Sequence, residues 1–311
     1  MFSNLKKKFP KLYADYHHFQ RRRLVRRTRQ MQNVPESKYP KIISKFYKKS
    51  MGHILNWDDL QTYTEKMQWE KIFNKDPMKA VLADKYRVRD WVSTKIGDEY
   101  LIPLLGCWKS FDDIDFESLP NQFVLKTNHG TGTNLIVKDK TALNYREVKR
   151  IFDDWMETDY AFTNSIQLHY KDIPRRIIAE KYLETDLGEL QDYKFLCFDG
   201  KPQFCWVDLG RFSKHTRTVF DMNWKLQPWT QASYGIADHE IEKPKNFDKM
   251  VELATILSKG FSHVRVDLYN VDGKIYFGEM TFTNGSGLDP IVPEKYDKIL
   301  GSYWKLPVNN R

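Results

Sequence analysis

Apolar residues in the middle and C-terminal parts of the chain form short runs bounded by turn-forming residues, which is the pattern of β-strands. The runs lie at residues 123–126, 134–138, 175–183, 192–209, 214–220 and 264–282. DYKFLCFDGKPQFCWVDL has Asp199-Gly200 near its centre, and Asp-Gly is a strong signal for a hairpin turn. The last run, VRVDLYNVDGKIYFGEMTF, also predicts two strands with a tight turn. Several neighbouring strands should therefore be antiparallel.

Other segments have the composition and apolar spacing of helices. They lie at residues 5–30, 58–72, 77–96, 143–158 and 246–260, with a short helix from about Pro293. Asp58 is the expected N-cap of the second segment, and Gly260 is the expected residue beyond the end of the fifth. This mixture of helices and hairpins predicts an α+β fold, in which antiparallel sheets carry packed helices.

Positive charge is concentrated near the N-terminus. The chain has 50 Lys and Arg residues and 41 Asp and Glu residues; ten of these bases and one acid lie in residues 1–30, so the remainder is balanced. A basic body built to bind nucleic acid is therefore not expected. Leu12, Tyr13, Tyr16 and Phe19 follow helical spacing within this segment. Two interpretations stay open: a surface helix for anionic lipid or polyanionic glycan, or a helix that packs its aromatic stripe on the body or on a second subunit.

The length of 311 residues suffices for two modest domains or one divided fold. No apolar run approaches the ~20 residues that span a bilayer, and no apolar stretch of a secretory signal follows the first basic residues. Cys107, Cys197 and Cys205 form an odd set without C-x-x-C spacing. They disfavour a disulfide framework or a zinc site and suit a reducing cytoplasm.

KTNHGTGTN, which begins at Lys126, has the composition of a phosphate-binding loop. Gly130 and Gly132 would let backbone N–H groups approach a ligand, and the two threonines add hydroxyl donors. Lys126 would supply a positive charge at the end of the preceding strand. A Walker A loop connects a strand to a helix, whereas this loop connects two strands. The alternative interpretation is that these residues form an ordinary hairpin loop without a ligand.

The last predicted hairpin carries charged residues inside apolar runs. If its turn is the three-residue loop 271–273, Arg265 lies opposite Glu279, and Asp267 lies opposite Phe277. All four then share one sheet face, because side chains alternate with period two, whereas a two-residue turn would separate the carboxylates. On one face the carboxylates would supply hard oxygen ligands for Mg²⁺, and Arg265 could hold a phosphoryl group. The alternative is an Arg265–Glu279 ion pair on a solvated face.

Three shorter patterns are less specific. In IIAEKYLE an apolar strand ends in a charged and aromatic step, where Glu180 and backbone groups could meet adenine, although a strand leaving a core has the same pattern. In ADKYRVRDW, Lys85 lies near the start of a predicted helix and is by itself typical of a solvated lysine. Asp113 and Asp115 have the D-x-D spacing of glycosyltransferases, but paired acids are common where a helix begins.

The order of these elements resembles that of the ATP-grasp ligases, such as D-alanine–D-alanine ligase. The segments DKYRVRDWV, FVLKTNHGTGTNLIV, AEKYLE, DYKFLCFDGKP, VRVDLY and GEMTFTNGSG are similar to the TupA-like, teichuronopeptide-synthesis branch, and the resemblance covers about residues 50–305. It implies an ATP-grasp fold, in which two lobes of antiparallel sheet and helices enclose a nucleotide. The implied parts are a basic helical extension at 1–50, a helical segment at 51–115, a small lobe with the Gly-rich loop at 116–183, and a large lobe with the metal-binding hairpin at 184–311.

The resemblance also implies roles for individual residues. Arg265 and Lys126 would be catalytic. The ATP-binding set would be Lys85, Lys126, His129, Gly130, Thr131, Gly132, Thr133, Glu180, Lys181, Tyr182, Leu183 and Lys194. Asp267, Glu279 and Asn284 would hold Mg²⁺. The superfamily usually ends the metal-binding strand with Glu-x-Asn, but here Thr281 stands in place of that Asn, so Asn284 would have to curl back.

The implied reaction is ATP-dependent amide formation through an acyl phosphate, between a carboxylate and an amine donor, on a bacterial capsule or cell-wall polysaccharide or its precursor. Arg211, Lys214, His215 and Arg217 could hold an acidic sugar or be a solvated basic loop. Two alternatives stay open: a kinase or glycosyltransferase acting on the same glycan, and a non-enzymatic protein that binds membrane or polyanion through residues 1–30. The expected location is cytoplasmic, with peripheral contact to the inner face of the membrane.

Overall fold

The computed structural model describes residues 10–185, 190–210 and 215–307, and the chain divides into two compact units. The first unit comprises the described parts of 1–38, 84–86 and 103–182, and the second those of 39–83, 87–102 and 183–311. Each unit is built around its own antiparallel sheet. Within the described residues, every helix is too short or too polar to traverse a bilayer.

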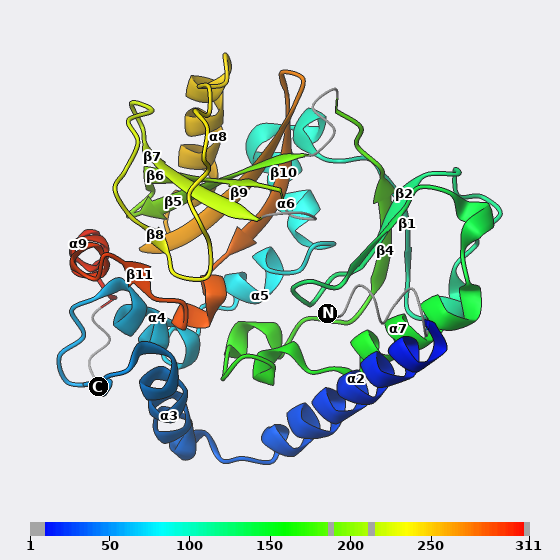
Figure 1. Ribbon diagram of the computed structural model, residues 1–311, viewed down its shortest axis with the longest axis horizontal. Coiled ribbons are helices and arrows are strands. Elements are labelled where there is room, and N and C mark those ends of the chain that lie inside the picture. The colour runs from blue at the N-terminus through cyan, green and yellow to red at the C-terminus, as the bar shows by residue number, and fades with distance from the viewer. Residues whose placement is uncertain (1–9, 186–189, 211–214, 308–311) are drawn as a thin grey trace. The chain divides into compact units, whose positions relative to one another are not determined.

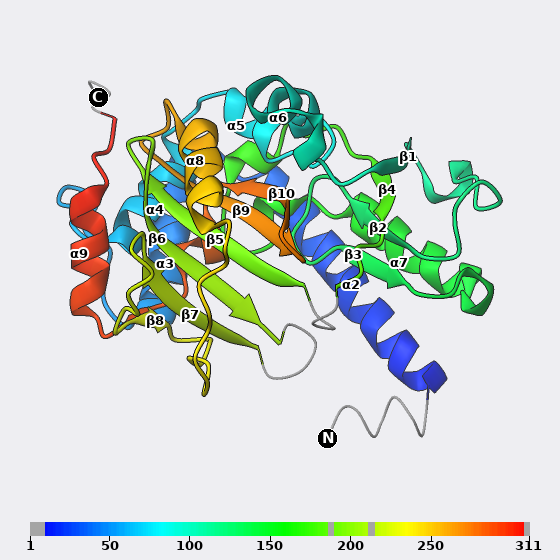
Figure 2. The same cartoon turned by 90° about the horizontal axis from the view of Figure 1, so that it is seen from above.

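The first unit contains a four-stranded sheet with strand order β1-β4-β2-β3. Its strands are β1 (Leu104–Trp108), β2 (Phe123–Thr127), β3 (Asn134–Val137) and β4 (Ile177–Lys181). Helix α7 (Tyr145–Glu157) lies against the sheet (Figure 2), where Val148 and Phe152 pack with Phe123 and Leu125. Buried and half-buried residues alternate along β2, so one face of this sheet forms the core of the unit.

Helix α2 (Pro10–Gln32) runs beside α7 (Figure 1) and contacts it through charged groups. Asp154 accepts hydrogen bonds from Arg21 Nε at 2.9 Å and pairs with His18 Nδ1 at 2.8 Å. Tyr16 and Phe19 are 48% and 61% exposed. The interpretation that the aromatic stripe packs on the body of the chain is therefore wrong for these two rings, because the basic side of the helix meets the acidic residues of α7.

The second unit contains a five-stranded sheet with strand order β10-β9-β5-β6-β7. Its strands are β5 (Gln191–Phe198), β6 (Lys201–Leu209), β7 (Thr216–Asp221), β9 (His263–Val271) and β10 (Lys274–Thr281); β8 (Thr230–Gln231) and β11 (Ile291–Val292) pair separately. Figure 1 shows α8 (Phe247–Ser258) along this sheet. It packs with α6 (Val88–Ile96) on one face, and α4 (Tyr63–Ile72) and α9 (Lys295–Tyr303) supply the core of the other. The remaining helices of this unit are α3 (Tyr39–Met51) and α5 (Met78–Leu82).

The predicted α+β class with antiparallel sheets is confirmed, but two predicted helices differ. The helix expected from Asp58 begins at Tyr63, because Thr62 is the N-cap and forms a capping box with Glu65. The helix expected over 77–96 is divided into α5 and α6. Lys85 lies in the turn between them rather than near the start of one continuous helix.

The turn of the β9–β10 hairpin has two residues, so the predicted three-residue loop is wrong. Val271 lies opposite Lys274, and the turn residues Asp272 and Gly273 have φ values of 51° and 90°. Positive φ at both positions is typical of the type I′ turn, whose twist matches that of the strands.

A β-bulge at Gly278 restores the face that the shorter turn would have changed. Glu279 lies opposite Asp267 after the bulge. A Cβ atom at position 278 would lie 3.1 Å from the Asp267 carbonyl oxygen, so the bulge needs the close approach that glycine permits. The predicted pairing partners are therefore wrong. The prediction that Arg265, Asp267 and Glu279 share a face is correct, while Phe277 belongs to the core on the other face.

Candidate active site

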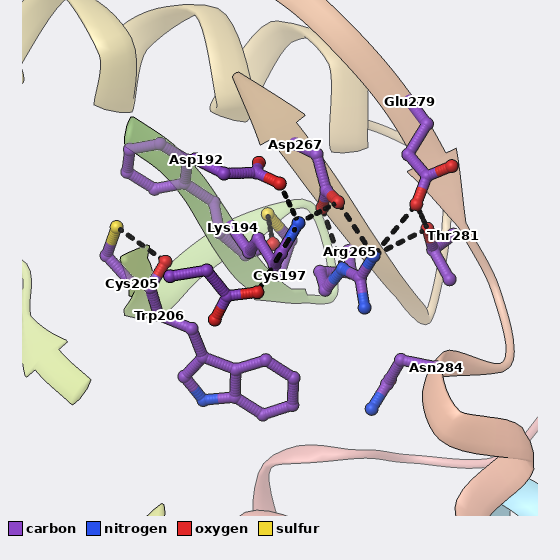
Figure 3. Close-up of polar contacts among 12 residues, drawn as sticks. Asp192, Lys194, Cys197, Cys205, Trp206, Arg265, Asp267, Glu279, Thr281 and Asn284 are labelled. Carbon is purple, nitrogen blue, oxygen red and sulfur yellow. Dashed lines mark hydrogen bonds and ion pairs between the residues drawn. The ribbon is translucent and has the colours of Figure 1, made fainter. Parts of the chain in front are cut away.

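A network of charged side chains occupies one face of the five-stranded sheet (Figure 3). Strand β5 contributes Asp192 and Lys194, β9 contributes Arg265 and Asp267, and β10 contributes Glu279. The first four side chains are buried. They share a face because alternation along β5 and β9 is combined with direct pairing of Lys194 with Asp267 across the strands.

Arg265 lies at the centre of this network. Its Nε and Nη2 atoms donate to the two carboxylate oxygens of Asp267, each at 2.7 Å. Nη2 also donates to Glu279 Oε1 and to Thr281 Oγ1, each at 3.0 Å. Lys194 Nζ donates to Asp192 at 2.5 Å and to Asp267 at 2.8 Å. Figure 3 shows Asp267 and Glu279 both directed at the guanidinium group.

Burial and charge act in opposite directions on these groups. Burial opposes the charged form of Arg265, but the carboxylates of Asp267 and Glu279 outweigh it and raise the pKa of the guanidinium above its ordinary value. Burial raises the pKa of the Asp267 carboxyl, and the positive charges of Arg265 and Lys194 oppose that rise. The network therefore holds its charges through mutual pairing rather than through water.

The same face continues into a second ion pair, between Asp208 of β6 and Arg217 of β7. Arg217 donates two hydrogen bonds of 2.6 Å to the carboxylate. Burial opposes ionisation of Asp208, but these hydrogen bonds and the charge of Arg217 lower the pKa of the carboxyl to about 2. The Arg217 guanidinium carbon also lies 4.7 Å from the centre of the Trp206 ring and 4.0 Å from that of Tyr234.

Of the four residues predicted to bind an acidic sugar, two are described. Arg217 lies in β7 and is buried in its ion pair with Asp208. His215 is half-buried, and its Nε2 atom lies 3.4 Å from the Asp208 carboxylate. Arg211 and Lys214 lie outside the described residues.

Asn284 begins the 3-10 turn η7 (Asn284–Gly287), which helix α4 holds in place. The Tyr63 hydroxyl donates to Asn284 Oδ1 at 2.5 Å and lies 3.1 Å from His263 Nε2. Two turns further along α4, Lys71 Nζ donates to the carbonyl oxygen of Ser286 at 3.0 Å. Burial lowers the pKa of Lys71 to about 7. The turn is thus fixed by a helix more than 200 residues away in sequence.

The proposed magnesium ligands fit a hard cation chemically. Asp267 and Glu279 converge on one positively charged group, which is Arg265 Nη2. Carboxylate and amide oxygens are the usual ligands of Mg²⁺, and Asn284 supplies an amide. Groups of three or more His, Cys, Asp or Glu side chains able to hold a metal do not occur in the part of the chain that the structure describes. A cation here would therefore depend on a third ligand of another kind, or on phosphate oxygens.

In the first unit, Lys126 and Glu180 lie side by side on adjacent strands and form an ion pair of 2.6 Å. Lys85 reaches the Gly-rich loop between β2 and β3, where its Nζ donates to the carbonyl oxygen of Gly130 at 2.7 Å. Both lysines therefore border this loop. In the predicted adenine hinge, the Lys181 backbone N–H bonds to Pro103 at 3.0 Å.

The Gly-rich loop is anchored at its base and exposed at its tip. Thr127 and Thr133 join their hydroxyl groups at 2.7 Å. His129 is buried against Tyr160, and burial lowers the pKa of its imidazole to about 3, so this side chain is neutral. Thr131 and Gly132 are exposed. The predicted phosphate loop thus offers its tip to a ligand, while the His129 side chain serves the core.

A comparison with models of protein families matches residues 65–305 to one family, described as TupA-like ATP-grasp. This chain belongs to the TupA-like ATP-grasp family. The match contains the Gly-rich loop and the charged network of the second unit. The ATP-grasp fold predicted from the order of the sequence elements is therefore confirmed. A search of curated proteins found no match.

Solved structures similar to this TupA-like ATP-grasp protein include ligases and synthases of low identity. D-alanine–D-alanine ligase from Bacillus anthracis, complexed with ATP, shares 16% identity over 65% of this chain and 54% of that chain, with a TM-score of 0.38. L-amino acid ligase from Bacillus licheniformis shares 14% over 68% and 45%, with a TM-score of 0.42. N5-carboxyaminoimidazole synthase from Aspergillus clavatus, in complex with ADP and a ribonucleotide, shares 14% over 65% and 44%, with a TM-score of 0.37. The chain spans about half the length of these proteins.

Three residues of the TupA-like protein that support the network were not predicted from the sequence as site residues. Asp192 pairs with Lys194, Asp208 pairs with Arg217, and Tyr63 bonds to Asn284. Asp192 and Lys194 are two residues apart on a predicted strand, so their side chains lie on the same face of the sheet. The sequence therefore contained a signal for this pair. Tyr63 carried none, because its partners are remote in sequence. Asp113 and Asp115, spaced as D-x-D, cap local turns by accepting backbone N–H groups.

Proposed function

We propose that this TupA-like ATP-grasp protein is an ATP- and Mg²⁺-dependent ligase that joins a carboxylate to an amine. The observation that supports this most directly is the network that joins the buried Lys194, Arg265 and Asp267 to the half-buried Glu279 within the family match. Charges held in a protein interior are costly unless each is paired. Perturbed titratable groups cluster at functional sites because charge is used there.

Positive groups and backbone donors would bind the phosphates of ATP. We assign this role to Lys85, Lys126 and Lys194 and to the exposed loop tip at Thr131 and Gly132. His129, Gly130 and Thr133 would act by fixing the shape of the loop. Glu180 and the backbone of Lys181, Tyr182 and Leu183 would contact the adenine and ribose. The Lys126–Glu180 pair would then hold Lys126 near the nucleotide.

In the proposed reaction, a carboxylate oxygen of the substrate attacks the γ-phosphorus of ATP. The bond from that phosphorus to the bridging oxygen breaks, and ADP leaves. The nitrogen of an amine then attacks the acyl carbon and loses a proton to water. Inorganic phosphate departs and leaves an amide. Arg265 and Lys126 would bind the negative charge of the phosphoryl group during transfer.

Asp267, Glu279 and Asn284 would hold Mg²⁺, which neutralises phosphate charge when bound. Arg265 Nη2 lies between the two carboxylates. Replacement of Arg265 by Met should therefore change the affinity of ATP for the protein in the presence of Mg²⁺, even without turnover. Equilibrium binding of a fluorescent ATP analogue, with and without Mg²⁺, measures this directly.

The proposed substrate is an acidic sugar of a bacterial capsule or cell-wall polysaccharide, or its precursor. A sugar carboxylate needs cationic partners, and the segment around His215 supplies Arg211 and Lys214 in sequence. Arg217 is committed to Asp208, so we assign it to positioning this strand rather than to substrate contact. The protein would act in the cytoplasm, where ATP is available.

The test is release of ADP and phosphate from ATP across a panel of uronic acids and amino acids. A ligase releases both only when a carboxylate and an amine are supplied together, whereas a kinase leaves phosphate on its product. Lys126→Met and Glu279→Gln should reduce release by at least about 100-fold, the scale of losing one transition-state contact. Lys171→Met and Glu252→Gln are controls at exposed positions and should leave it unchanged. Release that needs no amine, or that survives Glu279→Gln, would refute the proposal.

We also propose that α2 contacts the anionic surface of the membrane. Tyr16 and Phe19 are exposed on this helix, as are Arg23 and Arg26, for which no acidic partner lies among the described residues. Aromatic rings and basic groups together bind lipid interfaces, with about 1 kcal/mol from each basic residue. Phe19→Ala with Arg23→Gln should reduce sedimentation with vesicles that contain phosphatidylserine. Phe46→Ala, at another exposed ring, should not. Equal sedimentation of all three proteins would contradict this proposal.

A further inference from the structure

A pocket of about 360 Å³ lies within the second unit, where strands β6 and β7 meet α9. Its volume falls in the range of small-molecule sites. The described lining residues include aromatic side chains, amides and a single carboxylate, that of Asp221. Neither the family match nor the ligase chemistry proposed above gives this pocket a role. We infer that it is a binding site for a neutral or amino sugar of a glycan.

The aromatic side chains of the pocket pack against one another, and Tyr296 remains half-buried. Trp229 is fully buried and stacks on Tyr296, with ring centres 6.3 Å apart and planes at 21°. Phe204 packs edge-to-face against both Trp229 and Tyr303, at 5.3 and 5.8 Å. Tyr303 is 41% exposed. Aromatic rings offer flat apolar surface, which matches the C–H face of a sugar ring.

The polar side chains match sugar hydroxyl groups. Asn223 and Gln227 line the pocket, and an amide both donates and accepts hydrogen bonds, as a hydroxyl does. Asp221 Oδ1 accepts the backbone N–H groups of Asn223 and Lys225, each at 2.9 Å. This fixes the carboxylate at the pocket, and its other oxygen receives only a long contact of 3.4 Å from Gln227. Capacity to accept hydrogen bonds from a ligand therefore remains.

The charge of the pocket selects among glycans. Lys, Arg and His are absent from its described lining residues, whereas Asp221 contributes a negative charge. A phosphate or a uronic acid would meet repulsion without a counter-charge. A neutral sugar would be accepted, and the ammonium group of an amino sugar would be attracted. The site thus prefers a sugar unlike the acidic one that we propose for the ligase reaction, as a second unit of a mixed polymer would be.

Binding of the labelled full-length protein to an array of neutral, amino and acidic oligosaccharides tests this inference. ATP and Mg²⁺ are left out, so failure of the ligase proposal does not affect the result. We expect retention on at least one neutral or amino-sugar glycan. Tyr303→Ala should weaken it about tenfold, the effect of losing one aromatic contact. Tyr145→Ala removes a comparably exposed tyrosine from the first unit and should have no effect.

Two further variants keep the test decisive. Asn223→Ala changes an exposed side chain and should also weaken binding if Tyr303→Ala proves unstable in denaturation. Asp221→Asn keeps the Oδ1 acceptor but removes the charge, so it should weaken binding of amino sugars more than binding of neutral ones. Retention on acidic glycans alone, or no retention on any glycan, would overturn the inference. Binding of the Tyr303 and Asn223 variants that equals binding of the wild type would also overturn it.

Discussion

Replacement of Asp208 by Asn tests the electrostatic account of the charged sheet face. Both carboxylate oxygens accept hydrogen bonds from Arg217 at 2.6 Å, and the pair is almost fully buried. Asp208→Asn keeps the shape but leaves the guanidinium without its counter-charge. Removing one partner of a buried ion pair costs about 3–5 kcal/mol. We expect a loss of this size in the free energy of unfolding at pH 7.

The cost should depend on pH in a defined direction. The pKa of Asp208 is about 2 in the folded protein, against about 3.9 for an unfolded Asp. A carboxyl whose pKa is lowered by folding stabilises the protein above its unfolded pKa and loses that contribution as pH falls through its folded pKa. The difference is worth about 2.6 kcal/mol, and roughly half of it is lost by pH 3. The gap between wild type and Asp208→Asn should therefore narrow by about 1 kcal/mol between pH 7 and pH 3.

Urea denaturation of both proteins at a series of pH values measures this gap. Asp248→Asn is the control, because Asp248 is 87% exposed and pairs with the exposed Lys243; its cost should stay within about 0.5 kcal/mol at each pH. Adding Arg217→Met to Asp208→Asn should cost less than the sum of the two single changes. A gap below about 1 kcal/mol at pH 7, or one that is the same at pH 3, would refute this reasoning.

Three other substitutions address the elements around the site. Tyr63→Phe removes the hydrogen bond to Asn284 and should lower the free energy of unfolding by about 1–2 kcal/mol, measured by urea denaturation. Lys71→Met removes a buried amine whose pKa burial lowers to about 7. The unfolded chain protonates this amine at a higher pH than the folded protein does, so protonation favours the unfolded state as pH falls. The free energy of unfolding of the wild type should therefore decrease between about pH 10 and 7, and that of the variant should decrease less. Gly278→Ala places a Cβ atom 3.1 Å from the Asp267 carbonyl and should cost about 1–3 kcal/mol and weaken binding of ATP with Mg²⁺; unchanged binding and stability would show that the bulge tolerates a side chain.

Local signals predicted the hairpins, whereas the pairing within them was only partly predictable. Asp199-Gly200 and Asp272-Gly273 fix where the β5–β6 and β9–β10 hairpins turn, because few other dipeptides adopt positive φ at both positions. The bulge at Gly278 depends on the approach of the opposite strand, and no neighbour in sequence announces it. Arg265 and Asp267 were therefore placed on the correct face through an incorrect register.

Contacts between distant segments account for most of what sequence reasoning missed. Lys194 and Asp267 are 73 residues apart in sequence and pair across adjacent strands. Lys194, which was predicted to bind phosphate, is therefore also part of the charged network. Strand β1 (Leu104–Trp108) was not predicted, because its residues are half-buried and do not alternate. Lys85 was predicted from its motif, but its contact with Gly130 required the break between α5 and α6.

The hydrogen bonds of α4 have a practical consequence for anyone who expresses this protein in pieces. The family match starts at residue 65, yet Tyr63 reaches Asn284, and Thr64 donates its backbone N–H and its hydroxyl to the buried Asp297. A gene fragment trimmed to the matched boundary would delete both donors together with the helix cap at Thr62. In its product the buried carboxylate of Asp297 would lack the hydrogen bonds of Thr64, and a cavity would replace the ring of Tyr63. The shorter protein should therefore be less stable than the longer one and should aggregate or be degraded.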